Sequence, residues 1–356
     1  MIKVLVIKNT TDVVDFLLSI LNSDSTIRVT GVANNGQDVI EAVKQYKPDV
    51  IAISIDMHKM DGLETTRKIM ETIPTPIIVF INDFWNINDS TITLSAMEAG
   101  ALMVLPQPTR VKEIEFEATA TNLLQAIKAM AEVKVVRRWP KTQQKALQSL
   151  PRFIQKETSY YNKLSTTPQI VAIGVSTGGP IILQTILSNI PIDFPIPILI
   201  VQHMAVGFIR GFVEWLNQIS NLPVQLAVNG ERLIAGQVYI APDNNQIKIG
   251  IGGQIILTKD LSEIGHCPSI SNCFSSIAET YGKHAIGILL SGMGKDGAAE
   301  LKLMRDNGAI TIAQDEESSV VFGMPAEAIR LGAAQYILNP EKISLLLKDL
   351  LCNKNK

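Results

Sequence analysis

In the first 130 residues, short apolar runs alternate with longer segments whose apolar residues recur at helical spacing. Segment 10–21, for example, repeats apolar residues with a period of about 3.6, which is typical of an amphipathic helix. Strands that alternate with helices favour a parallel sheet covered by helices. We therefore predict a five-stranded, doubly wound α/β domain over residues 1–130. Its predicted strands are 3–7, 27–33, 50–55, 76–81 and 101–105.

A second alternation of apolar runs and helical segments begins near Pro168. It predicts a second doubly wound α/β domain over 166–356, with a mainly parallel sheet. Between 225 and 259, short apolar runs are separated by glycine and asparagine turns, which predicts a β-hairpin insertion. The predicted strands of the main sheet are 169–174, 197–203, 284–291 and 309–314.

The segment 131–165 between the two domains is basic. It contains no acidic residue between Val133 and Lys156, and it is interrupted by Pro140 and Pro151. We predict an exposed basic linker. Such a charge run is usually only solvated, and docking on an acidic partner is the alternative.

Composition excludes several classes of protein. The chain has 356 residues, which suggests two domains because a single core stops growing near about 250–300 residues. A formal net charge of -2 gives no sign of nucleic-acid binding. The longest apolar run, at 194–209, is too short to span a bilayer, and the N-terminus is unlike a secretory signal. Three cysteines form no disulfide framework and no zinc spacing. We expect a cytoplasmic protein with no membrane insertion.

Candidate chemistry begins with Ser176, in the sequence Gly-Val-Ser-Thr-Gly at 174–178. This pattern lies directly after a predicted strand and before a predicted helix. A tight strand-to-helix turn exposes a serine oxygen, and the helix N-terminus supplies amide groups for an oxyanion. A glycine-rich turn of this kind is also a common anion-binding site, so both interpretations remain open.

Two further polar residues follow predicted strands of the same domain. His203 ends the strand at 197–203, and Asp296 lies in a glycine-rich loop after the strand at 284–291. Taken singly, the histidine could be structural and the aspartate a helix cap. However, the carboxyl ends of parallel strands meet at one edge of the sheet. Ser176, His203 and Asp296 can therefore form a triad there, in an order that differs from that of α/β-hydrolases.

At this point the chain resembles the chemotaxis protein-glutamate methylesterases of the CheB family, in which a response-regulator receiver precedes a methylesterase domain. The resemblance covers nearly the whole chain and rests on IGVSTGGP, VQHM, VYIAPDNNQIKI, HCPSISNCFSSIA, LLSGMGKDGA and IAQDEESSVVFGMPAEAI. It implies a flavodoxin-like receiver fold for residues 1–130. It also implies that Ser176 is the nucleophile, His203 the general base and Asp296 the carboxylate that orients the histidine. The active-site loop and oxyanion residues it implies are Thr177, Gly178, Met293 and Gly294.

The same resemblance implies the reaction and the partner. The family hydrolyses γ-methyl esters of glutamates on the cytoplasmic domain of chemoreceptors, releases methanol, and deamidates certain glutamines. No metal or cofactor is needed for this step. Two residues depart from the family pattern, since we expect an arginine at Cys267 and an aspartate at Ser271. This leaves the substrate contacts near His266 open, and His266 itself can be an ordinary loop histidine.

The receiver-like domain lacks the residues of phosphoryl transfer. Receivers bind Mg²⁺ through carboxylates and accept phosphate on an aspartate at the end of the third strand. Here Ser54 stands at the acceptor position, and Lys8 and Asn9 replace the acidic pair. Ile81 replaces the hydroxyl residue and Gln107 the lysine. We predict a pseudoreceiver with an intact fold, no Mg²⁺ site and no aspartyl phosphate.

These predictions leave alternatives for function and regulation. The leading hypothesis is an active methylesterase on chemoreceptors. There are two alternatives. The chain is a non-catalytic scaffold in a two-component system, or it is an esterase that acts on another protein. Family receivers cover the active site until they are phosphorylated. Here the esterase would be constitutive, or a chemotaxis kinase or another protein would dock on the pseudoreceiver and relieve the inhibition.

Overall fold

The computed structural model describes residues 1–7, 11–33, 36–55, 62–81, 90–106, 113–131, 167–204, 206–259 and 266–351. The chain divides into two compact units, Met1–Lys145 and Ala146–Lys356. The predicted linker at 131–165 lies outside the described residues, apart from Ala131 at the end of a helix. The domain boundaries therefore stay predictions.

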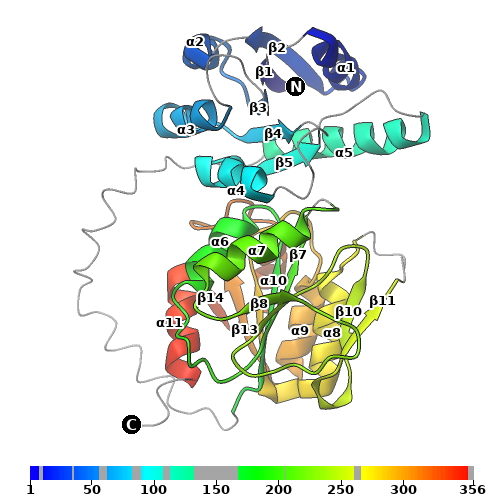
Figure 1. The fold of residues 1–356 in the computed structure, drawn as a ribbon, viewed down its shortest axis with the longest axis vertical. Coiled ribbons are helices and arrows are strands. Elements are labelled where there is room, and N and C mark those ends of the chain that lie inside the picture. The colour runs from blue at the N-terminus through cyan, green and yellow to red at the C-terminus, as the bar shows by residue number, and fades with distance from the viewer. Residues whose placement is uncertain are drawn as a thin grey trace, which may run out of the picture. The chain divides into compact units, whose positions relative to one another are not determined.

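In the N-terminal unit, strands and helices alternate as predicted (Figure 1). Its described strands form one sheet in the order β2-β1-β3-β4-β5, and all the strand pairs are parallel. This is the flavodoxin-like order. Its elements are β1 (Ile2–Ile7), α1 (Thr11–Asn22), β2 (Ile27–Ala33), α2 (Gly36–Tyr46), β3 (Val50–Ser54), α3 (Gly62–Thr72), β4 (Ile77–Ile81), α4 (Ser90–Ala99), β5 (Met103–Pro106) and α5 (Glu113–Ala131).

The C-terminal unit is built on a larger sheet. Within the described residues seven strands pair in the order β14-β13-β12-β6-β7-β9-β8, and each neighbouring pair is parallel. Its elements are β6 (Ile170–Val175), α6 (Gly179–Leu187), β7 (Ile198–Gln202), α7 (Ile209–Ile219), β8 (Val224–Leu226), β9 (Val238–Ile240), β10 (Gln246–Ile249), η4 (Ile251–Gly253), β11 (Ile255–Thr258), α8 (Ile270–Tyr281), η5 (Gly282–His284), β12 (Ala285–Leu289), α9 (Ala298–Asp306), β13 (Ile310–Gln314), α10 (Met324–Arg330), β14 (Tyr336–Leu338) and α11 (Pro340–Leu351).

Helices cover both faces of this sheet, as the apolar strands require. β6, β7 and β12 are buried at every position, which is typical of parallel strands that are covered on both sides. In Figure 1, α11 (red) lies on one side of the sheet and the α8–α9 pair (yellow to orange) on the other. The core between the sheet and α8 includes Tyr239, Phe274 and Leu289, which are all fully buried.

The predicted β-hairpin insertion is present, but it is shorter than the β-rich segment 225–259 that the sequence suggests. β10 and β11 form an antiparallel hairpin of their own. β9 instead pairs with β7 and belongs to the main parallel sheet, with β8 as the edge strand. β8 and β9 have three residues each, and the frequent turns around them made these two strands difficult to predict from the sequence.

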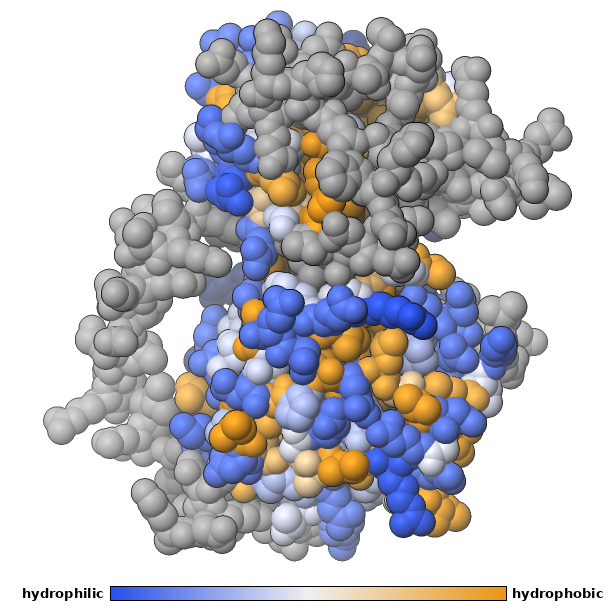
Figure 2. All heavy atoms as spheres, viewed as in Figure 1, coloured by the Kyte–Doolittle hydropathy of each residue, from blue (hydrophilic) through white to orange (hydrophobic). Residues whose placement is uncertain are grey.

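The surface of the C-terminal unit is mostly hydrophilic on the face shown in Figure 2, with apolar residues in smaller groups between the polar ones. None of the helices in the described segments is long and apolar enough to cross a membrane.

Candidate active site

The nucleophile candidate Ser176 occupies the tight turn between β6 and α6. Its amide donates to Ser291 O at 2.9 Å, and its carbonyl accepts from Gly179 N at 2.9 Å. Gly178 adopts a left-handed conformation with φ +82°, and an added Cβ would lie 2.5 Å from Val320 Cγ2. Only glycine satisfies both conditions, so the small residues of the motif are required by the turn.

His203 and Asp296 are brought together by two other strand ends. His203 directly follows β7, and its amide donates at 3.0 Å to Val175 O, the carbonyl just before Ser176. Asp296 lies in the loop between β12 and α9. His203 Nε2 lies 3.0 Å from Asp296 Oδ2, and both side chains are largely buried. The predicted convergence of the serine turn, the histidine and the aspartate at one sheet edge is therefore present in the structure.

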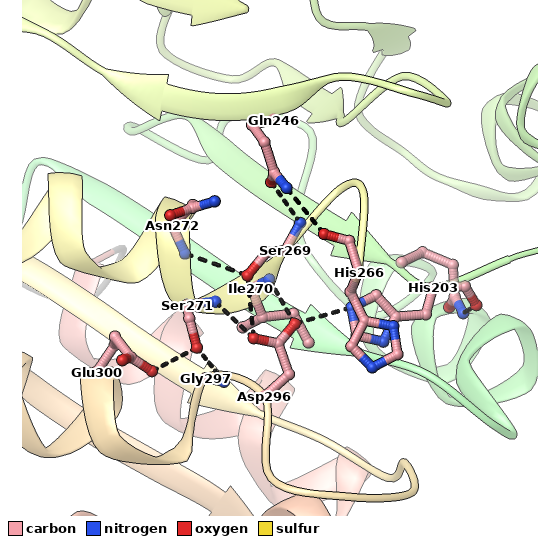
Figure 3. A network of polar contacts seen from close by, with 11 residues as sticks. His203, Gln246, His266, Ser269, Ile270, Ser271, Asn272, Asp296, Gly297 and Glu300 are labelled. Carbon is pink, nitrogen blue, oxygen red and sulfur yellow. Dashed lines mark hydrogen bonds and ion pairs between the residues drawn. The ribbon is translucent and has the colours of Figure 1, made fainter. Parts of the chain in front are cut away.

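Asp296 is further held by the start of α8, which belongs to a different segment of the chain (Figure 3). Its Oδ2 accepts from Ile270 N at 2.8 Å. Its Oδ1 accepts from Ser271 N at 3.0 Å and from Ser269 Oγ at 3.1 Å. The carboxylate thus caps a helix, as one sequence interpretation allowed, but it caps α8 and not the adjacent α9. Capping and contact with His203 are compatible because each uses different donors.

These contacts determine the charge of Asp296. Burial alone would raise the pKa of the carboxyl group, but hydrogen bonds and charge from His203, together with donors from Ser271 and Ile270, hold it well below its usual range. The N-terminus of α8 also lowers the pKa of Asp296, since its first amides have no partner within the helix and favour an anion. Asp296 is therefore ionised throughout the neutral pH range.

Ser271 is one of the two residues that depart from the expected family pattern. Its side chain joins two helices beside the site. Its Oγ donates to Glu300 Oε2 at 2.5 Å and accepts from Gly297 N at 2.9 Å. Ser271 therefore ties the start of α8 to the start of α9. Nearby, Gln246 Nε2 donates to His266 O at 2.8 Å, and its Oε1 accepts from Ser269 N at 2.8 Å (Figure 3).

His266 lies against His203. The two imidazole rings stack with centroids 4.4 Å apart and an interplanar angle of 14°. Burial of the ring, followed by the charge of His203, lowers the pKa of His266 below its ordinary value. His266 therefore stays neutral over a wider pH range than a free histidine, and it places no second positive charge on the general-base candidate. The neighbouring Cys267 is partly exposed.

The loop after β12 packs directly on the nucleophile turn. An added Cβ on Gly292 would lie 2.7 Å from Ser176 Cβ. Ser291 Oγ donates to Thr177 O at 2.8 Å. Met293 is half exposed in the same loop, and Gly294 follows in a left-handed conformation with φ +83°. The start of the loop that carries Met293 and Gly294 therefore contacts the serine turn through Ser291 and Gly292.

Two of the predicted receiver positions can be located. Ser54 is the last residue of β3 and is half-buried, and Ile81 is the last residue of the neighbouring β4 and is buried. Both side chains therefore stand at the carboxyl ends of strands, as the receiver register requires. Lys8, Asn9 and Gln107 lie outside the described residues.

Sequence reasoning missed several residues that organise the site. Gln202 contacts the backbone of Ser176 and of His203, and Gln314 Oε1 accepts from Ser291 N at 2.8 Å. Both are amide side chains at the last position of a mostly apolar, fully buried strand. A buried polar residue at that position was the available signal, because such a group requires hydrogen-bond partners.

Fold and site together define a class. A five-stranded unit with the receiver strand order precedes an α/β unit that carries a serine turn, a histidine and an aspartate at one sheet edge. This is the class of response regulators whose output domain has the architecture of a hydrolase.

The comparisons with known proteins agree with this class. Residues 4–118 match the response regulator receiver domain family, and residues 171–347 match the CheB methylesterase family. The chain belongs to the CheB methylesterase family, with an N-terminal receiver domain.

Relatives match along the whole chain. The chain is 47% identical over 350 residues to protein-glutamate methylesterase/protein-glutamine glutaminase 1 of Syntrophus aciditrophicus, covering 98% of both chains. It is 46% identical over 356 residues to the enzyme of the same name from Nitrosospira multiformis, covering 100% of this chain and 99% of the relative. The crystal structure of the Thermotoga maritima CheB methylesterase catalytic domain matches 52% of this chain and 100% of its own, with 38% identity and a TM-score of 0.50.

Proposed function

We propose that the chain is a protein-glutamate methylesterase that hydrolyses glutamate γ-methyl esters on chemoreceptors through Ser176, His203 and Asp296. One observation carries the proposal: His203 Nε2 lies 3.0 Å from Asp296 Oδ2, beside the turn that contains Ser176. A buried carboxylate whose pKa is held low suits the role of orienting a histidine base.

In the proposed mechanism each ring nitrogen of His203 has its own role. His203 Nε2 lies 3.0 Å from Asp296 Oδ2, so in the proposed mechanism the neutral imidazole carries its proton on Nε2, beside the carboxylate. Nδ1 is left as the basic nitrogen, and it accepts the proton of Ser176 Oγ as that oxygen attacks the ester carbonyl carbon. Asp296 then stabilises the imidazolium that forms.

The backbone supplies donors for the oxyanion. The amides of Thr177 and Met293 have no hydrogen-bond acceptor among the described residues. They flank Ser176 from the α6 and the β12 sides, and free amides in such a position stabilise the tetrahedral oxygen. When the intermediate collapses, His203 returns its proton to the methoxy oxygen and methanol leaves. Water, deprotonated by His203, then hydrolyses the acyl-serine and releases the glutamate carboxylate.

The same steps deamidate a glutamine, since its side-chain amide reacts at the same carbonyl carbon and ammonia leaves in place of methanol. The two relatives described above carry both activities in their names. We include this second activity in the proposal on that ground and on the shared acyl intermediate.

The receiver unit is proposed to be unable to form an aspartyl phosphate. Ser54 at the acceptor position has no carboxylate, and the buried Ile81 has no hydroxyl to contact a phosphoryl oxygen. Lys8 and Asn9 place no carboxylate where Mg²⁺ would need one. Regulation, where it exists, then comes from a protein that docks on the receiver.

The test is hydrolysis of methyl esters on a methylated chemoreceptor fragment by the wild type and by Ser176→Ala. We expect methanol release from the wild type and none above background from Ser176→Ala. Equal rates in the two proteins would contradict the nucleophile. No release from the wild type, together with labelling of Ser176 by a fluorophosphonate, would move the assignment to another protein ester. Absence of both would favour the scaffold.

A further inference from the structure

Gln202, the last residue of β7, joins the serine turn to the histidine. It is 2% exposed. Its Nε2 donates to Ser176 O at 3.0 Å and to His203 O at 2.7 Å. Both protons of one amide nitrogen are therefore used on the carbonyls of the two residues between which the proposed mechanism moves a proton.

The oxygen of the same carboxamide shows that this arrangement has a free-energy cost. Gln202 Oε1 is buried and has no hydrogen-bond partner among the described residues. Burying a polar oxygen without a hydrogen-bond partner destabilises the folded state. The reversed amide would be worse, because it would direct Oε1 at two carbonyl oxygens. An apolar side chain of similar length would fill the space but would donate to neither carbonyl, so the amide is explained by these two contacts and not by space filling.

The local packing also depends on this amide. A Cβ added to Gly179 would lie 1.9 Å from Gln202 Oε1. The first residue of α6 must therefore be glycine for the carboxamide to reach the serine turn. On the opposite side of that turn, Ser291 Oγ holds Thr177 O at 2.8 Å. The two consecutive carbonyls of the turn are thus each held by a side chain from a different neighbouring strand end.

We infer that Gln202 is a positioning residue for acylation, which sets the separation of Ser176 and His203 by bridging their carbonyls. The inference rests on the proposed function. Gln202 acts on backbone atoms and not on the substrate, so its loss reduces kcat and leaves KM unchanged. A displacement of about 1 Å in such a pair reduces the rate on the order of 100-fold.

The first experiment replaces the amide by an apolar chain of similar length in the full-length protein. We expect Gln202→Met to lower kcat on the methylated receptor fragment by roughly 10- to 100-fold. Labelling of Ser176 by a fluorophosphonate should slow to a similar extent, with KM unchanged. The matched control is Thr311→Val, which removes another buried side-chain donor to a carbonyl in the same sheet, 2.6 Å from Ala333 O. It should keep wild-type kcat at a temperature where both variants are folded.

A second pair of variants separates stability from positioning. Gly179→Ala forces the carboxamide out, so it should lower both stability and kcat. Adding Gln202→Ala to it removes the collision with Oε1 but leaves the new Cβ 2.9 Å from Val175 Cγ2, so the melting temperature should recover in part relative to Gly179→Ala. If kcat is as low in Gln202→Ala alone as in this double variant, positioning is supported. If kcat returns together with stability, Gln202 is only structural and the inference is wrong.

The outcomes distinguish the two proposals. A wild-type rate that is lost in Ser176→Ala but kept in Gln202→Met overturns the inference alone. A wild-type rate equal to that of Ser176→Ala overturns the proposed function, and the inference falls with it. Equal loss of kcat in Gln202→Met and in Thr311→Val would also overturn the inference, because it would show a general effect of destabilisation.

Discussion

At the scale of single residues, Asp296 has more partners than a carboxylate that only orients a histidine would need. It contacts His203 Nε2 and also accepts from Ser269 Oγ and from the amides of Ile270 and Ser271. One side chain therefore supports the proposed chemistry and also joins the β12–α9 loop to α8. Its substitution should affect activity and stability by separable mechanisms.

Asp296→Asn should lower kcat by roughly 10³- to 10⁴-fold, because an amide in this position favours the wrong histidine tautomer. It should also lower the free energy of unfolding by about 1–3 kcal/mol, since the NH₂ group cannot accept from α8. Enzyme kinetics and denaturant unfolding measure the two effects. The control is Asp315→Asn, in a carboxylate that accepts from Ser318 N at 3.0 Å and contacts no triad residue. A near-wild-type rate in Asp296→Asn would contradict the triad.

The low pKa of Asp296 predicts how stability depends on pH. Its folded-state pKa lies below the unfolded value of about 3.9, so the folded state is favoured when the group is ionised. The stability advantage of the wild type over Asp296→Asn should be constant near neutral pH. It should decline as the pH falls below about 4, toward the depressed folded-state pKa. Unfolding curves of both proteins between pH 7 and pH 3 test this, and an advantage that grows in acid would contradict it.

At the scale of elements, the site is a junction of strand ends. Ser176 directly follows β6, His203 directly follows β7, and the loop after β12 carries Asp296 and packs on the serine turn. The contact between Gly292 and Ser176 shows how little room this junction has, since an added Cβ would lie 2.7 Å from Ser176 Cβ. The proposed chemistry at this sheet edge therefore depends on glycine at position 292 as well as on the three polar side chains.

Gly292→Ala should lower kcat by on the order of 10- to 100-fold, because it displaces the nucleophile or the β12–α9 loop. The control is Gly252→Ala at the tip of the β10–β11 hairpin, where φ is +72° and nothing lies within 4 Å of the added Cβ. That variant should lose about 1 kcal/mol of stability to backbone strain and keep its kcat. Equal kcat in the two alanine variants would contradict the close packing of the loop.

At the scale of the whole molecule, we propose that the chain combines a receiver unit that cannot accept a phosphoryl group with an active methylesterase unit. Acetyl phosphate with Mg²⁺ should therefore add no phosphoryl group to the full-length protein, as measured by intact mass, and should leave the esterase rate unchanged. Ser54→Asp should give the same result, because Lys8 and Asn9 still place no carboxylate where Mg²⁺ would need one. Phosphoryl incorporation that raises the rate would contradict the pseudoreceiver.

Whether the receiver unit inhibits the esterase is a separate prediction at the same scale. If the inhibition survives, a chain that begins at Ser159 should hydrolyse receptor methyl esters faster than the full-length protein. If it does not, the two rates should be equal and the enzyme constitutive. The corresponding catalytic domain of the Thermotoga maritima relative has been crystallised by itself, so the truncation is expected to fold.

Much of the fold followed from local patterns, and the exceptions share a cause. Fully buried strands such as β6, β7 and β12 were predicted closely, because burial on both faces requires a nearly unbroken apolar run. β8, β9 and β14 have three residues each, which is too short for a pattern to register. Their place in the sheet is decided by pairing with neighbours that are distant in sequence.

The sequence by itself determined the two α/β units, the serine turn and the convergence of Ser176, His203 and Asp296 at one edge. These follow from strand periodicity and from the rule that parallel strands end together. Only the tertiary structure decided that Asp296 caps α8, that His266 stacks on His203 and that Gln202 bridges the serine turn and the histidine. Each of these contacts joins segments whose spacing along the chain carries no periodic signal, and each depends on side-chain directions that packing alone selects.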